Sequence, residues 1–102
     1  MEILEIKNTE EFENEVLKSE SCVFVDFFAT WCMPCKMMAG IIDKIAEEYT
    51  NVKFVKVDVD QNRELATKYN IMSIPTMMIF KKGMPTKTFI GVTDKEEIVK
   101  EF

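Results

Sequence analysis

Two cysteines, Cys32 and Cys35, stand three residues apart in the run Trp31-Cys32-Met33-Pro34-Cys35. At the start of a helix, one turn brings two such sulfurs close enough to bond, and the helix dipole favours a thiolate on the N-terminal one. A thiolate at Cys32 would attack a substrate disulfide. Cys35, shielded one turn deeper, would then attack Cys32 and release the reduced substrate. The spacing therefore indicates reversible thiol–disulfide exchange.

The same spacing also occurs in half of a zinc or iron–sulfur site, which usually needs four ligands. Cys22 is the only other cysteine, and the chain contains no histidine, so we expect no metal. Cys22 falls in an apolar run and is expected to be an inert buried thiol rather than a regulatory or dimer-forming one. The eight methionines are expected to fill the core and scatter over the surface rather than to bind copper.

Proton transfer has to use another group, because histidine is absent. Asp26 lies in the otherwise apolar run 23–28, where burial without a partner raises the pKa of a carboxyl group. It is the best candidate to accept and return the proton of Cys35 through water, unless its face of the strand is solvated. Lys56, on the neighbouring strand, is expected to modulate Asp26, although a solvated lysine fits that position equally well.

The elements that must hold these residues follow from hydrophobic periodicity. Segment 22–29 is almost unbroken β-branched and aromatic, which is typical of a central strand buried on both faces. Asn8 and Glu11 have the spacing of a helix-capping box. The prediction is strands at 2–6, 22–29, 53–59, 76–80 and 87–91, a turn at 82–85, and helices over 8–17, 34–49, 60 or 61 to 69, and from 94.

The resulting order, β-α-β-α-β-α-β-β-α, defines an α/β fold with a central mixed five-stranded sheet flanked by four helices. The first three strands are connected by helical crossovers and so can be parallel, whereas the last two form an antiparallel hairpin. With 102 residues, of which 47% are hydrophobic and 30% charged, the chain is expected to fold as one domain over residues 1–102.

The composition also excludes several classes of partner and location. A formal net charge of −5 would repel nucleic acid and anionic lipid surfaces, so neither is expected to bind. Residues 1–7 lack a basic segment followed by an apolar stretch, and no apolar run is long enough to span a bilayer. Three cysteines do not make the paired framework of a secreted scaffold. We therefore expect a cytoplasmic protein.

The stretch from Val25 to Lys36, VDFFATWCMPCK, resembles the active-site segment of the thioredoxin family. The resemblance continues through Lys56-Val57-Asp58-Val59-Asp60 and Ile74-Pro75-Thr76 to the glycines Gly83 and Gly91, and so covers essentially the whole chain. It implies the thioredoxin fold, a cis peptide bond before Pro75 that faces the disulfide, and protein disulfides as substrates.

The resemblance also implies a substrate-binding groove beside Cys32. Bound there, an extended substrate segment would be held by main-chain hydrogen bonds. Simple core packing is the alternative for Ile74 and Ile90. The groove residues would be Trp31, Ile74, Pro75, Ile90 and Gly91, together with Met33 and Pro34 between the two cysteines.

Three positions depart from the usual family pattern. Met33 replaces a glycine between the cysteines and puts a flexible side chain where it can alter docking or the redox potential. Phe28 replaces a tryptophan, and Gly40 takes the place of a proline that kinks the helix. None of these changes removes a reacting group, and the retained Pro34 favours a reducing couple.

By this resemblance the chain is a protein-disulfide reductant that supports cell redox homeostasis. It would need no bound cofactor beyond the redox-active disulfide Cys32–Cys35. Its partners would be thioredoxin reductase, supplied with electrons from NADPH or another carrier, and proteins that contain disulfides. We expect a monomer. Two other functions stay open, namely an oxidant or isomerase whose potential is shifted by Met33, and a redox-inert module that binds a partner in the same groove.

Overall fold

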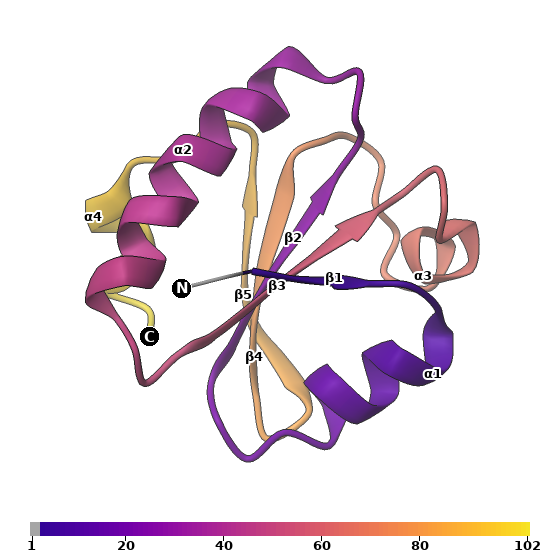
Figure 1. Ribbon diagram of the computed structural model, residues 1–102, viewed down its shortest axis with the longest axis horizontal. Coiled ribbons are helices and arrows are strands. Elements are labelled where there is room, and N and C mark those ends of the chain that lie inside the picture. The colour runs from indigo at the N-terminus through magenta and orange to yellow at the C-terminus, as the bar shows by residue number, and fades with distance from the viewer. Residues whose placement is uncertain (1–2) are drawn as a thin grey trace.

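The computed structural model describes residues 3–102, and a mixed five-stranded sheet forms its centre (Figure 1). Strands β1, β3 and β2 run parallel, and β4 is antiparallel to both of its neighbours. The predicted α/β fold and the order of its elements are confirmed. The strands are β1 (Leu4–Ile6), β2 (Val23–Phe28), β3 (Lys53–Asp58), β4 (Thr76–Lys81) and β5 (Met84–Ile90), in the spatial order β1-β3-β2-β4-β5.

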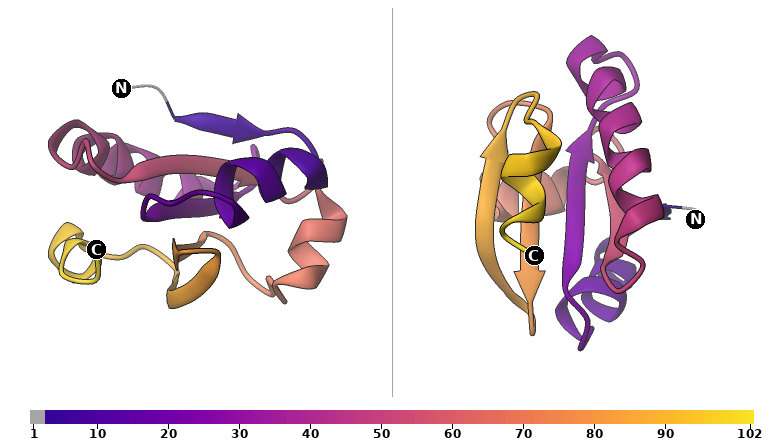
Figure 2. Two further views of the ribbon diagram at one scale, coloured as in Figure 1. Left: turned by 90° about the horizontal axis from the view of Figure 1, so that it is seen from below. Right: turned by 90° about the vertical axis from the view of Figure 1, so that its left-hand side faces the viewer.

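The helices cover both faces of the sheet, as the two views in Figure 2 show. An apolar stripe on each helix packs against the sheet and leaves the polar side chains in water. On one face lie α2 (Met33–Glu48) and α4 (Lys95–Val99), and on the other lie α1 (Thr9–Phe12), its π-helical continuation η1 (Glu13–Leu17), and α3 (Arg63–Lys68).

Strand β2 lies in the middle of the sheet and is buried along almost its whole length, as its continuous apolar sequence predicts. Phe24 packs in the core under α2, whereas Val25 and Phe27 pack in the core on the opposite face. Because side chains alternate along a strand, Asp26 points to the same face as Phe24, toward α2. The strand therefore places one carboxyl group under the helix that begins at the cysteines.

The predicted N-terminal cap of the first helix is confirmed. The side-chain oxygen of Asn8 accepts the N–H of Glu11 at 2.8 Å. Glu11 does not return a bond to Asn8, as a capping box would require, but accepts the N–H of Lys7 at 2.7 Å. Of the strand predicted at 2–6, residues 4–6 are confirmed, and Glu2 lies outside the described residues.

The predicted turn at 82–85 is too long. Lys82 and Gly83 have φ angles of 52° and 79°, the geometry of a two-residue turn that joins antiparallel strands. Strand β5 therefore starts at Met84 rather than at residue 87. It includes Pro85, which is tolerated because β5 is an edge strand whose register is irregular beside Ile79.

Helix α3 also begins later than predicted, at Arg63 rather than at residue 60 or 61. The N–H groups of Gln61 and Asn62 both donate to the carbonyl oxygen of Asp58, so these residues form a turn at the end of β3. The side-chain amide of Asn62 donates to the Asp58 and Ile6 carbonyl oxygens and ties this turn to β1. Side-chain bonds of this kind compete with helix formation and delay its start.

Helix α2 runs without interruption past Gly40. A methyl group added to Gly40 would meet no atom within 4 Å, and alanine loses less backbone entropy in a helix than glycine does. We therefore expect Gly40→Ala to raise the free energy of unfolding by about 0.5–1 kcal/mol, measured by urea unfolding.

Gly83→Ala is the matched control for this change. Its φ is positive, and an added methyl would lie 2.7 Å from the Leu17 carbonyl oxygen, so it should lower the free energy of unfolding. A loss of stability in Gly40→Ala would contradict the open helical environment at position 40.

Candidate active site

Cys32 and Cys35 are joined by a disulfide, with their Cα atoms 5.2 Å apart. Cys32 is the N-terminal cap of α2, and Pro34 lies in the first turn, where its missing N–H removes no helical hydrogen bond. The Cys32 sulfur accepts the N–H of Cys35 at 3.2 Å. The sulfur of Cys32 thus lies at the positive end of a 16-residue helix, which stabilises a thiolate.

Ile74 and Pro75 face the disulfide from the loop before β4. The bond between them is cis, as the resemblance implies. The carbonyl oxygen of Ile74 lies 3.9 Å from the Cys32 sulfur, and that of Pro75 accepts the N–H of Gly91 at 2.8 Å. The structure therefore brings Ile74, Pro75 and Gly91 together beside Cys32.

The two cysteines are equally buried, because each has only 4% of its surface exposed in this oxidised form. The exposed fractions therefore do not support the expectation that Cys35 is more shielded than Cys32. Their surroundings differ instead. Cys35 lines a partly open pocket together with Asp26, whereas Cys32 contacts the Ile74 carbonyl oxygen.

Asp26 is buried rather than solvated, with 6% of its surface exposed. Its Oδ1 has no hydrogen-bond partner among residues 3–102. Burial raises the pKa of Asp26 to about 7, and Lys56, its neighbour in strand register, opposes that shift. Asp26, Cys35 and Lys56 line one cavity of about 260 Å³. A carboxyl group that titrates near neutrality is thereby placed in the same cavity as one of the two sulfurs.

Two polar residues of this region are not singled out by the sequence pattern. Asp60 accepts the indole N–H of Trp31 at 2.8 Å and so fixes the ring. The signal for Asp60 is its place just beyond β3, since the carboxyl ends of parallel neighbouring strands meet at one edge of the sheet. Lys36 lines the pocket that contains Asp26. Phe28 lines the same pocket, and the ammonium group of Lys56 lies 5.7 Å from the centre of its ring.

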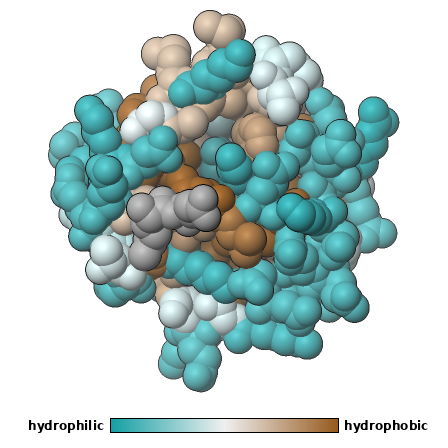
Figure 3. All heavy atoms as spheres, in the orientation of Figure 1, coloured by the Kyte–Doolittle hydropathy of each residue, from teal (hydrophilic) through white to brown (hydrophobic). Residues whose placement is uncertain are grey.

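The side chains around the disulfide are largely exposed. Trp31 and Met33 each have 67% of their surface exposed, and Ile90 has 70%, so core packing does not explain Ile90. Ile74 is half-buried against the disulfide, and Pro75 is buried. In Figure 3, apolar side chains gather over the start of α2, while hydrophilic side chains cover most of the surrounding surface.

Cys22 lies just before β2 and is half-buried rather than fully buried as expected. Burial raises the pKa of its thiol, and Lys81 opposes that shift, so Cys22 is a weaker nucleophile than an exposed cysteine. Among the residues that the structure describes, no cluster of three histidine, cysteine or acidic side chains is arranged to hold a metal ion, and no helix is long and apolar enough to cross a membrane.

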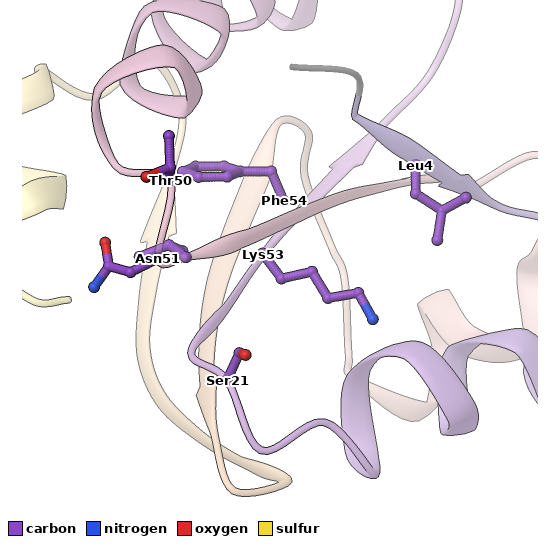
Figure 4. Close-up of a pocket in the computed structure, with 7 residues that line it drawn as sticks. Leu4, Ser21, Thr50, Asn51, Lys53 and Phe54 are labelled. Carbon is purple, nitrogen blue, oxygen red and sulfur yellow. The ribbon is translucent and has the colours of Figure 1, made fainter.

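A separate hollow of about 370 Å³ lies at the other end of β3 (Figure 4). Its walls come from β1, the segment before β2 and the turn between α2 and β3. Lys53 extends from this hollow toward η1, where it forms a salt bridge with Glu15 at 2.5 Å. The cysteines lie beyond the opposite end of the sheet, so this hollow takes no part in their chemistry.

A redox-active cysteine pair at the start of a helix, on this mixed sheet and opposite a cis-proline, defines the class of thiol–disulfide oxidoreductases. A family model described as thioredoxin matches residues 3–102. The chain belongs to the thioredoxin family.

Relatives and solved structures agree with this assignment. Thioredoxin 1 of Synechococcus elongatus is 49% identical over 85 residues, which cover 82% of this chain and 79% of that protein. Thioredoxin of Rickettsia bellii is 45% identical over 89 residues, which cover 86% of this chain and 85% of that protein. A solved structure of Plasmodium falciparum thioredoxin superimposes with a TM-score of 0.91 at 33% identity and covers 98% of this chain and 99% of that one.

Proposed function

We propose that this oxidoreductase works as a cytoplasmic reductant of protein disulfides, with Cys32 as the attacking and Cys35 as the resolving thiol. The Cys32 thiolate attacks one sulfur of a substrate disulfide, forms a mixed disulfide and expels the other sulfur as a thiolate. Cys35 then loses its proton and attacks Cys32, which releases the second substrate thiol and restores the Cys32–Cys35 disulfide. The position of Cys32 at the N-terminus of α2 carries this proposal.

The proton of Cys35 goes to Asp26. Their shared cavity of about 260 Å³ has room for water that relays the proton, and a pKa of about 7 lets the carboxylate both accept and return it at neutral pH. Lys56 keeps that pKa from rising further, because its positive charge favours the ionised carboxylate. Asp26 and Lys56 therefore set the pH range in which the second step is fast.

An extended segment of the substrate docks on the exposed residues around Cys32. Trp31, held by Asp60, provides one wall, and the backbone of Ile74 offers hydrogen bonds beside the reacting sulfur. Main-chain recognition tolerates many sequences, which suits a general reductant. The proposed contact residues are Trp31, Met33, Pro34, Ile74, Pro75, Ile90 and Gly91.

The cycle is completed by re-reduction. Thioredoxin reductase is the proposed electron donor, in keeping with the family, and the chain acts as a monomer whose redox-active disulfide replaces a bound cofactor. Neither nucleic acid nor a membrane is part of the proposed function, since the net charge is −5.

The equilibrium reduction potential of the Cys32–Cys35 pair tests the direction of the reaction. We expect a value near or below about −270 mV, measured by thiol alkylation and mass spectrometry across a dithiothreitol redox series at pH 7. A value higher by about 60 mV, or about 2.8 kcal/mol for two electrons, would favour an oxidant or isomerase and implicate the exposed Met33. The absence of a reversible couple would favour a binding module.

A further inference from the structure

A further pocket, of about 200 Å³, lies beside the proposed substrate groove between the loop that follows α3 and the hairpin β4–β5. None of the residues that line it carries a charge, although charged residues make up 30% of the chain. The walls are mostly apolar, and the polar groups among them are hydroxyls and the side-chain amide of Asn70. They include Tyr69, Met72, Ser73, Met78, Thr88 and Ile90.

The loop that forms one wall is held firmly by the end of α3. The N–H of Ile71 donates to the carbonyl oxygen of Ala66, and that of Asn70 donates to Thr67. Asn70 has a φ of 55°, so the helix ends in the motif that turns the chain sharply away. Ile71 packs against the core, and the next residue, Met72, is left with 84% of its surface exposed. The pocket is thus built into the fold.

The pocket continues directly from the proposed groove. Ser73 and Thr76 flank the Ile74–Pro75 segment, whose Ile74 carbonyl lies 3.9 Å from the Cys32 sulfur. Ile90 pairs in register with Thr76 and precedes Gly91. Because Ser73 adjoins Ile74 and an extended chain advances about 3.3 Å per residue, a substrate segment that starts at Cys32 passes the pocket within a few residues of its reacting cysteine.

We propose that this pocket is a specificity subsite that takes one aliphatic or methionine side chain of the substrate, two to four residues from its reacting cysteine. The uncharged and mostly apolar lining favours such a side chain and disfavours an acidic or basic one, which would lose hydration without gaining an opposite charge. Met72 forms the outer rim, and its flexible thioether side chain adapts to different shapes. The inference rests on the proposed groove and names the class of substrate that it selects.

The test uses nonapeptides with a single central cysteine joined by a disulfide to thionitrobenzoate. The reduced protein forms its own disulfide and releases one peptide thiol and one coloured thionitrobenzoate per turnover, so electrons balance and absorbance follows the rate. Leucine, serine or aspartate is placed at each position from one to four residues on either side of the cysteine. We expect leucine at one position two to four residues away to raise kcat/KM about five-fold over serine, through a lower KM.

Met72→Lys should reduce this preference for leucine to less than about two-fold, whereas Met72→Leu should keep it. Met84→Lys is the matched control, because Met84 is also an exposed methionine but lies at the far end of the hairpin, and it should keep the preference. The reduction potential should be the same in all three variants, since none of these side chains contacts a sulfur.

Equal rates for leucine and serine peptides at every position would overturn the subsite while leaving disulfide reduction intact. A preference that survives in Met72→Lys, or is lost equally in Met84→Lys, would also overturn it. If no peptide disulfide is reduced, the proposed function fails and this inference fails with it.

Discussion

Replacing Cys35 with serine is expected to turn the protein into a trap that stays covalently joined to its substrates. Cys32 can still attack a substrate disulfide, but the serine hydroxyl cannot attack the resulting mixed disulfide, so the releasing step is lost. We expect steady-state reduction of a disulfide-containing protein such as insulin to fall at least about a thousand-fold. Non-reducing electrophoresis should show an adduct that disappears with dithiothreitol.

The controls for this trap use the other two cysteines. Cys32→Ser should form no adduct, because Cys35 lines the pocket beside Asp26 and not the proposed substrate groove. Cys22 is half-buried and takes no part in the exchange. The double variant Cys22→Ser, Cys35→Ser should therefore trap as much substrate as Cys35→Ser alone. Adducts in Cys32→Ser, but not in Cys35→Ser, would show that Cys35 is the attacking thiol and Cys32 the resolving one.

The elements that carry the site follow from the sequence because their local signals agree with the tertiary structure. The apolar run of β2 marks the centre of the sheet, and the periodicity after Pro34 gives α2. The predicted bounds of helices and strands are wrong mainly at their ends, as at the starts of α3 and β5. Side-chain hydrogen bonds from Asn62 delay α3, and the paired positive φ angles of Lys82 and Gly83 shorten the hairpin turn.

The candidate site was predictable only where a chemical type or a family motif marks it. A lone aspartate in an apolar strand points to Asp26, and the cysteine spacing points to the disulfide. The bond between Trp31 and Asp60 joins residues 29 positions apart, which periodicity does not relate. The pocket under Met72 combines the residues after α3 with the two strands of the hairpin β4–β5, so its shape depends on how these elements pack and not on one periodic pattern.

Replacing Asp26 with asparagine is expected to stabilise the fold above pH 7 and to leave it nearly unchanged near pH 4. The folded pKa of about 7 is higher than the value of 3.8 for an unperturbed carboxyl group, so the folded state holds the proton more tightly. That contribution to stability is complete below about pH 4 and is lost as the pH rises through 7. A shift of about three pKa units corresponds to about 4 kcal/mol, and asparagine, which does not titrate, avoids the loss.

Urea unfolding of the oxidised protein at pH 4 and pH 8 measures this effect. Asp58→Asn is the matched control, because Asp58 is equally buried but its Oδ1 accepts the N–H of Asp60 at 2.9 Å. It should destabilise the fold at both pH values through the weakened hydrogen bond. A gain for Asp26→Asn that is the same at pH 4 and pH 8 would contradict ionisation as its cause.

The same Asp26→Asn variant should be a poorer catalyst, since asparagine cannot accept the proton of Cys35. We expect the release of the peptide from its mixed disulfide with Cys32 to slow about a hundred-fold at pH 7 and its dependence on pH near 7 to disappear. Thionitrobenzoate leaves in the first attack, so the second step is measured by rapid acid quench and mass spectrometry of the remaining mixed disulfide. The first attack by Cys32, at the helix N-terminus, should change far less. Higher stability combined with slower release would identify Asp26 as a buried charge retained for catalysis at the expense of stability. An unchanged release rate would leave the raised pKa without a role in the reaction.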